Sequence, residues 1–256
     1  TRLCSSAASD VYKRQCRSVR KIMIAIIPVR KGSQRVPNKN IKRFANSSLL
    51  EIKVKQLMRV GLFEEIVVSS DCEDMLELAR GLGAETHRRE EKYCRAGTPM
   101  CEVYSHIAHC FSDYSSIAYV NVTNPLIQDL SLHKCYSAFK NRSPEVVSVN
   151  TVHEVKDFLW CDGAPVNYDP YNQPRSQDLP QYYALNFACN IIRTDVMLHK
   201  GVVVGTPFVG IFIDKIQALD IDDIHDFEIA ETLYKNTHMR GSCLLYTSPS
   251  PRDLRA

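Results

Sequence analysis

The chain has 256 residues, of which 45% are hydrophobic, and its 32 basic and 29 acidic side chains give a formal net charge of +3. This length is enough to bury a full hydrophobic core, and we expect a single domain. No apolar run approaches the roughly 20 residues that cross a bilayer, and the segment before Met23 lacks the apolar centre of a secretion signal. These features argue against a membrane partner and favour a cytoplasmic protein.

The ten cysteines are scattered along the sequence and form no C-x-x-C pair. Disulfide frameworks and zinc sites usually show closely and regularly spaced cysteines. We therefore predict reduced, structural thiols, as is usual in the cytoplasm.

Both ends lack the apolar periodicity of the rest of the chain. Residues 1–15 and 243–256 resemble translated adaptor sequence, although ordinary disordered tails are the alternative. We expect residues 1–22 and 241–256 to be non-native or disordered, with adaptor-derived sequence up to about residue 15. Met23 is the expected native start, and residues 23–240 are predicted to form the single domain.

Setting the ends aside changes the charge balance. They contain eight of the 32 basic and two of the 29 acidic residues, which leaves 24 basic and 27 acidic residues between them. Because the body is slightly acidic, a nucleic-acid partner is not expected.

The body alternates predicted strands with predicted helices. Short runs of apolar and β-branched residues indicate strands at 24–29, 66–69, 117–122 and 146–149. Helical spacing of apolar residues predicts helices at 47–62, 73–82 and 130–139, the first two followed by glycine stop signals. This alternation predicts an α/β fold, a mainly parallel sheet with helices on both faces.

In such sheets, ligands bind beyond the carboxyl ends of the strands. That rule places the loop containing Arg30, the residue Asp71 and the segment 121–125 along one edge. A helix N-cap is an equally good interpretation of Asp71.

Residues 157–180 break the alternation and are rich in Pro, Asn, Asp, Gly and Tyr, with a predicted turn at Asp162–Gly163. A long irregular segment with aromatic residues is more often functional than idle. We expect an arm at about 155–181 that reaches a second subunit.

A cation-rich loop follows the first strand and carries Arg30, Lys31, Arg35 and Lys39 around Gly32. It is neither a Walker A motif nor G-x-G-x-x-G. Backbone amides and forked guanidinium groups suit phosphate oxygens, so the loop predicts a triphosphate site, with a solvated surface as the alternative.

Near the end of the body, Asp220 and Asp222 alternate around Ile221. On a strand both carboxylates would point to one face, and paired hard oxygens suit Mg²⁺. Asp223, Asp226 and Glu228 are expected to charge the first turn of the last helix.

Residues 24–40 resemble the N-terminal signature of the acylneuraminate cytidylyltransferases, the CMP-sialic acid synthetase family, P-x-R-x-G-S-K-x-[IV]-x-x-K-N after an apolar strand. The matching residues are Pro28, Arg30, Gly32, Ser33, Val36, Lys39 and Asn40. Gln34 stands where the family usually has lysine, with Lys31 or Arg35 as possible substitutes.

Three further strings are similar to motifs of the same family. Residues 68–71 match V-S-[ST]-D, and 120–126 match L-Q-P-T-S-P-L with Asn121 in place of glutamine. Residues 172–192 are similar to the Q-P-R-Q-x-L-P string of the sugar pocket, with Phe187 at a usual glycine. Residues 219–231 resemble the I-D-I-D segment that closes the active site.

The resemblance implies a Rossmann-like nucleotidyltransferase fold with a protruding dimerisation arm. It implies catalytic roles for Arg30, Lys39, Asp220 and Asp222, the two aspartates being the implied Mg²⁺ ligands. The implied nucleotide contacts are Pro28, Val29, Arg30, Gly32, Ser33, Asn40 and Arg88 or Arg89. The implied sugar contacts are Asn121, Thr123, Arg175, Gln177, Tyr182, Asn186 and Phe187, although packing is an equal alternative for the aromatic residues.

The activity implied by the resemblance joins CTP to a nine-carbon 2-keto-acid sugar and releases pyrophosphate, in a homodimer. One alternative is a related enzyme that acts on the eight-carbon keto acid of lipopolysaccharide. A second is a nucleotide-binding homologue with impaired catalysis.

Overall fold

The computed structural model describes residues 21–33 and 35–238, so Gln34 and most of both predicted tails lie outside the described residues. Strand β1 (Lys21–Pro28) begins two residues before Met23, the expected native start. The seven cysteines in the described ranges are free thiols. Within these ranges no helix is both long and apolar enough to cross a membrane.

The centre of the fold is a seven-stranded sheet in the order β11-β7-β10-β6-β1-β4-β5. Beside β1, its strands are β4 (Glu65–Ser70), β5 (Glu85–Arg88), β6 (Tyr114–Tyr119), β7 (Ser148–Val155), β10 (Tyr182–Arg193) and β11 (Phe208–Phe212). Strand β10 pairs antiparallel with both neighbours, and the other pairs are parallel. The predicted mainly parallel α/β sheet is confirmed.

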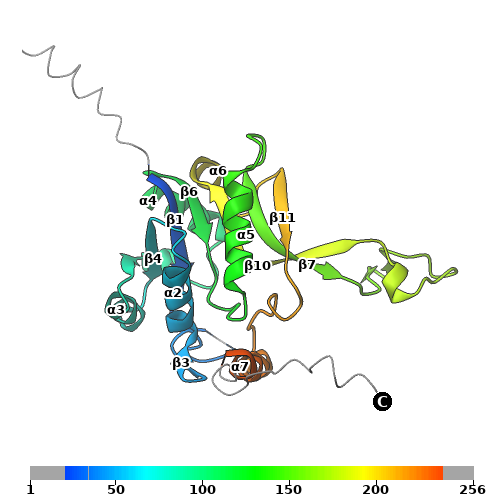
Figure 1. Ribbon diagram of the computed structural model, residues 1–256, viewed down its shortest axis with the longest axis horizontal. Helices are drawn as coiled ribbons and strands as arrows, with labels where there is room; N and C mark the ends of the chain where they lie inside the picture. The colour runs from blue at the N-terminus through cyan, green and yellow to red at the C-terminus, as the bar shows by residue number, and fades with distance from the viewer. Residues whose placement is uncertain (1–20, 34, 239–256) are drawn as a thin grey trace, which may run out of the picture.

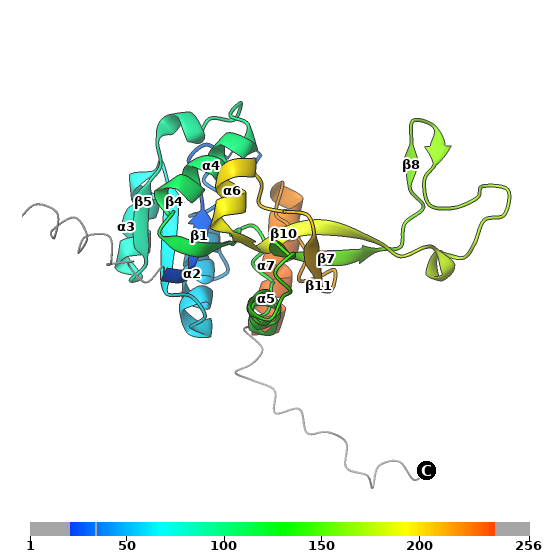
Figure 2. The ribbon, with the colours of Figure 1, turned by 90° about the horizontal axis from the view of Figure 1, so that it is seen from above.

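Helices cover both faces of this sheet, as Figures 1 and 2 show. One face carries α2 (Leu49–Val60) and α5 (Asp129–Lys140), the other carries α4 (Met100–Cys110) and α6 (Thr194–Lys200), and α7 (Ile224–His238) lies beyond the carboxyl ends of the strands. Helix α3 (Glu73–Gly81) packs near the edge formed by β4 and β5.

Strand β1 shows why both faces are needed. Met23, Ala25 and Ile27 belong to one apolar cluster, whereas Ile24 and Ile26 belong to the other. Because successive side chains of a strand point to opposite faces, an unbroken apolar run buries both sides of the sheet.

Helix α2 lies within the predicted helix 47–62 and ends at the predicted glycine stop, although it begins two residues later than predicted. The Ser48 hydroxyl accepts a hydrogen bond from the Glu51 amide at 3.2 Å, and Gly61 ends the helix with φ +60°. A short polar side chain satisfies an amide that the first helical turn leaves unpaired, and glycine adopts the left-handed conformation without steric cost.

Two predicted strands differ in extent from the observed ones. Strand β6 ends at Tyr119, so Asn121 and Thr123 lie in the loop that follows. Strand β7 is longer than predicted because it continues outward from the sheet beside β10.

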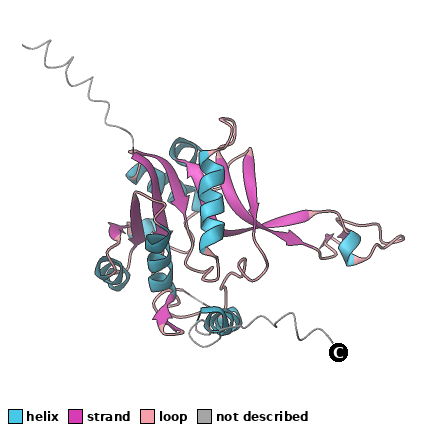
Figure 3. Cartoon of the chain, viewed as in Figure 1, coloured by secondary structure: helices cyan, strands magenta, loops and turns pink. Residues whose placement is uncertain are grey.

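This continuation carries the arm, which protrudes from the body in Figures 1 and 3. The arm contains a small hairpin of β8 (Trp160–Cys161) and β9 (Ala164–Pro165) and the 3-10 turn η2 (Ser176–Asp178). Asp162 and Gly163 join the hairpin with φ of +50° and +79°, the signs of the type I′ turn that tight hairpins favour. The predicted arm and turn are present, and contact with a second subunit stays a prediction.

Candidate nucleotide-binding site

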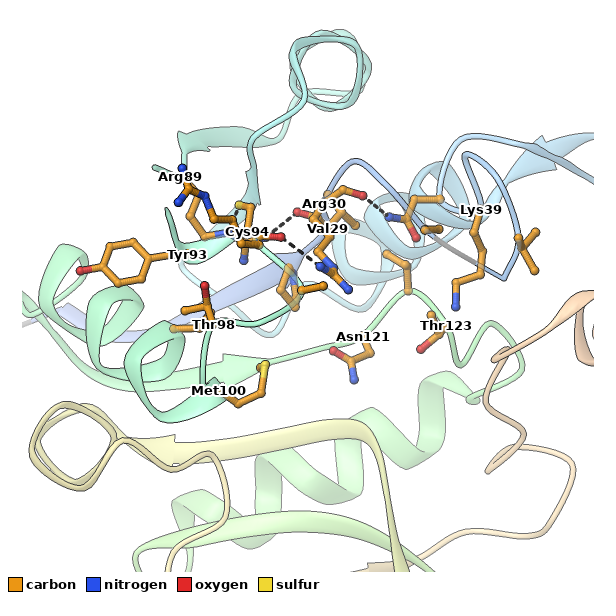
Figure 4. A pocket seen from close by; sticks show the side chains of 18 of the residues that line it. Val29, Arg30, Lys39, Arg89, Tyr93, Cys94, Thr98, Met100, Asn121 and Thr123 are labelled. Carbon is orange, nitrogen blue, oxygen red and sulfur yellow. Dashed lines mark hydrogen bonds between the residues drawn. The ribbon is translucent and has the colours of Figure 1, made fainter. Parts of the chain in front are cut away.

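A cavity of about 450 Å³ lies at the carboxyl ends of β1 and β6, a volume typical of small-ligand sites (Figure 4). Three chain segments and one aspartate line it. They contribute Pro28, Val29, Arg30, Ser33, Arg35, Val36, Lys39 and Asn40; Arg89, Tyr93, Cys94, Arg95, Ala96, Thr98, Met100 and Val103; Tyr119, Asn121, Val122 and Thr123; and Asp222.

Hydrogen bonds from several elements hold the cation-rich loop over this cavity. Asn40 Nδ2 donates to the Arg30 carbonyl at 3.3 Å, and Arg30 Nη1 donates to the Cys94 carbonyl at 3.0 Å. The Lys31 amide donates to Asp71 Oδ1 at 2.9 Å. Asp71 therefore supports the loop. The alternative interpretation of Asp71 as a helix N-cap is wrong, because Cys72 occupies that position at α3.

The structure distinguishes the two adjacent arginines of the Thr86–Glu90 segment. Arg89 is only 4% exposed and lines the cavity, where it donates to the Val29 carbonyl at 2.7 Å. Arg88 points to the opposite side of β5, forms an exposed ion pair with Glu73 at 2.7 Å and does not line the cavity. Arg88 is the last residue of β5 and Arg89 follows it, and successive residues of an extended backbone point to opposite sides.

The two aspartates reach the site because their segment binds the loop after β6. The Ile221 amide donates to the Thr123 carbonyl at 2.9 Å, and Asn124 Nδ2 donates to the Leu219 carbonyl at 3.1 Å. Lys39 donates to the Ile221 carbonyl. The expectation of a strand here is wrong: residues 219–222 form no ladder, and these three contacts fix the segment instead.

The charges of the site perturb one another. Desolvation raises the pKa of Asp220, a hydrogen bond with Thr123 opposes this rise, and the charge of Asp222 adds to it. Burial lowers the pKa of Lys39, and the two carboxylates oppose that shift. These effects place the ammonium group and both carboxylates in one electrostatic cluster.

The same cluster has suitable ligands for a hard divalent cation. Asp222 lines the cavity and the Asp220 carboxylate senses its charge, so two hard oxygen donors are close to the cation-rich loop. Mg²⁺ is usually held by one or two carboxylates together with substrate phosphates and water. The donor set therefore fits Mg²⁺.

The side chains of Asp223 and Asp226 accept hydrogen bonds from backbone amides at the start of the helix that follows. Asp226 Oδ2 accepts from the Asp222 and Asp223 amides at 3.0 Å, while Asp223 Oδ1 accepts from the Asp226 amide at 3.0 Å. This reciprocal arrangement is like a capping box and fixes the start of α7 immediately after the D-x-D segment.

The predicted sugar contacts other than Asn121 and Thr123 do not line this cavity. Arg175 and Gln177 are exposed on the arm, where Arg175 pairs with Asp178 at 2.7 Å. Tyr182, Asn186 and Phe187 lie on β10. Gly32 and Asp220 are also absent from the lining, although both adjoin residues of the site.

A bulge in β10 explains the geometry around Asn186 and Phe187. The pairing of β10 with β7 shifts between Leu185 and Asn190, and Phe187 has φ +55°, a conformation that favours glycine. Asn186 Oδ1 accepts from the Thr151 hydroxyl at 2.6 Å, whereas its buried Nδ2 has no partner among the described residues.

Sequence reasoning missed one wall of the cavity, formed by Tyr93, Thr98, Met100 and Tyr119 with neighbours of the 93–98 segment. Its irregular part includes only a three-residue turn, η1 (Glu91–Tyr93), before α4 begins. No glycine-rich or charged motif marks these residues. Only the position of Tyr119 within the predicted parallel strand 117–122, whose carboxyl end faces the ligand edge, could have indicated it.

The mostly parallel sheet and a cation-rich cavity at its carboxyl edge define a Rossmann-like protein of the nucleotidyltransferase class. A solved structure of CMP:2-keto-3-deoxy-manno-octonic acid synthetase complexed with CTP has the same fold, with a TM-score of 0.65 and 12% sequence identity. The match covers 84% of this chain and 99% of that one.

The family model described as Cytidylyltransferase matches residues 24–182, and the chain belongs to this family. It is 27% identical to an N-acylneuraminate cytidylyltransferase of Escherichia coli, over 87% of this chain and 57% of the relative. It therefore spans little more than half the length of that relative. A pseudaminic acid cytidylyltransferase of Campylobacter jejuni is 26% identical, over 84% of this chain and 97% of the relative.

Proposed function

We propose that this protein is a CMP-sugar synthetase that joins CTP to a sialic-acid-like nonulosonate and releases pyrophosphate. The observation that carries this proposal is the convergence of Arg30, Lys39 and Asp222, from segments far apart in sequence, on one cavity at the carboxyl edge of the sheet. Its relatives from two bacteria, named for neuraminate and pseudaminate activation, support a nine-carbon acid as the substrate class.

The reaction requires the anomeric hydroxyl of the sugar to attack the α-phosphorus of CTP in line with the departing pyrophosphate. Catalysis then depends on positioning the reactants and neutralising the charge that develops on the leaving group. Arg30 and Lys39 would hold the triphosphate, and their place in the lining of the cavity supports this role. The lowered pKa of Lys39 reflects the desolvated surroundings in which such contacts are strong.

Asp220 and Asp222 would hold Mg²⁺ beside the triphosphate. The ion would supply charge neutralisation at the phosphate oxygens and acidify a nearby hydroxyl. Around it, the chain's own contribution is to fix both carboxylates through the bonds of Ile221 and Asn124 to their partners. No histidine or glutamate lines the described cavity as a general base.

We assign the sugar carboxylate to Arg175, whose guanidinium group matches a carboxylate in a two-pronged contact. Arg175 is on the protruding arm and its side chain is 76% exposed. The arm also exposes apolar surface at Trp160, Val166 and Tyr171, which favours a protein contact. The arm would then carry Arg175 to the cavity of a second subunit in a homodimer.

Subunit mixing tests this arrangement. If one active site combines Asp222 of one subunit with Arg175 of the other, the inactive variants Asp222→Ala and Arg175→Ala would complement each other. Random reassortment of the two would restore roughly a quarter of the wild-type activity, because half of the dimers would contain one intact site. Mixtures that stay inactive while exchange is verified would contradict an arm shared between subunits.

The substrate itself is tested with a panel of keto acids. The chain is given CTP, Mg²⁺ and, in separate reactions, N-acetylneuraminate, a legionaminate, a pseudaminate and an eight-carbon 3-deoxy acid, and pyrophosphate release is measured. We expect release with at least one nine-carbon acid. Preference for the eight-carbon acid would favour the lipopolysaccharide alternative, and CTP binding without release from any acid would favour a non-catalytic homologue.

A further inference from the structure

A cluster of three metal-ligating side chains lies behind the wall of the nucleotide cavity. Across residues 21–33 and 35–238, His87, His106 and Cys110 form the one such group of His, Cys, Asp and Glu. Their ligand atoms all lie within 4.8 Å of one another. His87 comes from β5, and His106 and Cys110 come from α4.

The spacing within α4 suits a tetrahedral metal. His106 and Cys110 are four residues apart and so lie on the same face of the helix. Cys110 Sγ is 3.8 Å from His106 Nε2. With a Zn–S bond of about 2.3 Å and a Zn–N bond of about 2.0 Å, two ligands of a tetrahedral zinc lie roughly 3.6 Å apart.

Neighbouring groups hold both imidazole rings in place. Ser69 Oγ is hydrogen bonded to His87 Nδ1 at 3.0 Å, which leaves Nε2 of that ring for a ligand. Tyr93 stacks on His106 with 3.9 Å between ring centroids, and Phe111 packs edge-on against His87 at 5.3 Å. A hydrogen bond donated by the second ring nitrogen is the usual support of a metal-binding histidine, and His87 Nδ1–H would donate to Ser69 Oγ in this way.

We propose that His87, His106 and Cys110 form a zinc site that is separate from the Mg²⁺ site of the D-x-D segment. Two imidazole nitrogens and one thiolate are the borderline-soft ligand set that zinc prefers over Mg²⁺. The three protein ligands leave a fourth position for water. The thiol proton is released to solvent when the thiolate binds the metal.

A metal at this site would restrict the movement of one wall of the nucleotide cavity. Tyr93 lines the cavity on one side and stacks on His106 on the other. A metal held between β5 and α4 would therefore fix the turn η1, which contributes to the cavity wall that sequence reasoning missed.

Zinc titration of the untagged full chain tests the site. After removal of metals with a chelator, Zn²⁺ is added in competition with a chromophoric chelator. We expect one equivalent to bind with a Kd below about 1 μM. Cys110→Ser and His106→Gln are expected to weaken this binding at least about tenfold.

Matched controls lie on the same helix. Cys101→Ser and His109→Gln change the same residue types in α4 and are expected to leave zinc affinity unchanged. Cobalt gives a second readout: the wild type is expected to show a thiolate-to-cobalt charge-transfer band that Cys110→Ser removes. Equal zinc affinity in the wild type and both ligand variants, or a band that persists in Cys110→Ser, would overturn the proposal.

Discussion

The Arg35 guanidinium group lies 3.3 Å from the Asp222 carboxylate, and this ion pair joins the cation-rich loop to the segment before α7. Both side chains are largely exposed, at 66% and 60%. Exposed ion pairs contribute little to stability, so the pair can open at small cost. In the proposed function the ion pair opens when substrate binds. Asp222 then contacts Mg²⁺, and Arg35 contacts a phosphate group of CTP.

This ion pair predicts that Arg35→Gln has two separate effects, one on the Mg²⁺ requirement and one on the KM for CTP. Loss of the competing cation is expected to lower the Mg²⁺ concentration for half-maximal activity about two- to fivefold. This factor corresponds to the interaction free energy of an exposed ion pair. Loss of a phosphate contact is expected to raise the KM for CTP roughly tenfold or more. Initial rates over a matrix of Mg²⁺ and CTP concentrations separate the two effects.

Arg35→Lys is the control for that experiment, because it keeps the charge but not the forked geometry. It is expected to fall between the wild type and Arg35→Gln in both parameters. A variant that needs more Mg²⁺ than the wild type would refute competition between Arg35 and the metal.

Asp222→Ala is expected to abolish turnover and leave the fold intact. The side chain is exposed and supports no helix cap, since only its backbone amide bonds to Asp226. Turnover with Mg²⁺ and thermal unfolding are measured together, and Asp113→Ala, at an exposed position far from the cavity, serves as the control. Near-normal turnover would disprove the metal-ligand assignment.

Lys53 predicts an unusual dependence of stability on pH. It is fully buried in α2, and desolvation lowers its pKa to about 7. The unfolded lysine keeps its proton up to about pH 10.4, so between these values the unfolded state binds more protons and stability rises with pH.

Relative to Lys53→Met, the free energy of unfolding of the wild type is expected to rise by on the order of 3 kcal/mol between pH 7 and pH 10. Urea unfolding of both proteins across this range gives the difference. Because Lys53 also donates to the Asn124 carbonyl at 3.0 Å, only the pH dependence is diagnostic. Parallel curves for the two proteins would exclude the assigned pKa.

The backbone conformation of Phe187 predicts an effect on stability that the contacts of its side chain would not indicate. Its φ of +55° places a side chain in the left-handed region. Phe187→Gly and Phe187→Ala both remove the ring and differ only in the Cβ atom. We expect the glycine variant to be more stable than the alanine variant by about 1 kcal/mol in urea unfolding. An alanine variant that is equally stable would show that the bulge relaxes.

Local patterns predicted the elements that local physics determines. The stop at Gly61 and the hairpin turn at Asp162–Gly163 depend on a few neighbouring residues, and the sequence was sufficient for both. The edge of the sheet that carries the cavity followed from the strand–helix alternation.

Features that depend on distant contacts were harder to predict. The choice between Arg88 and Arg89 depends on which side of β5 faces the cavity, and the shape of residues 219–222 depends on hydrogen bonds to the loop after β6. Tyr93 lines the cavity because of packing against α4, which no spacing in the sequence encodes.

The most direct measurement follows labelled phosphate through the reaction. CTP labelled at the α-phosphate and CTP labelled at the γ-phosphate are given separately to the chain with Mg²⁺ and the nine-carbon acid that releases pyrophosphate. The account predicts α-label in the sugar product and γ-label in pyrophosphate. Label from the γ-phosphate in the sugar, or no labelled sugar although CTP binds, would contradict nucleotidyl transfer by this protein.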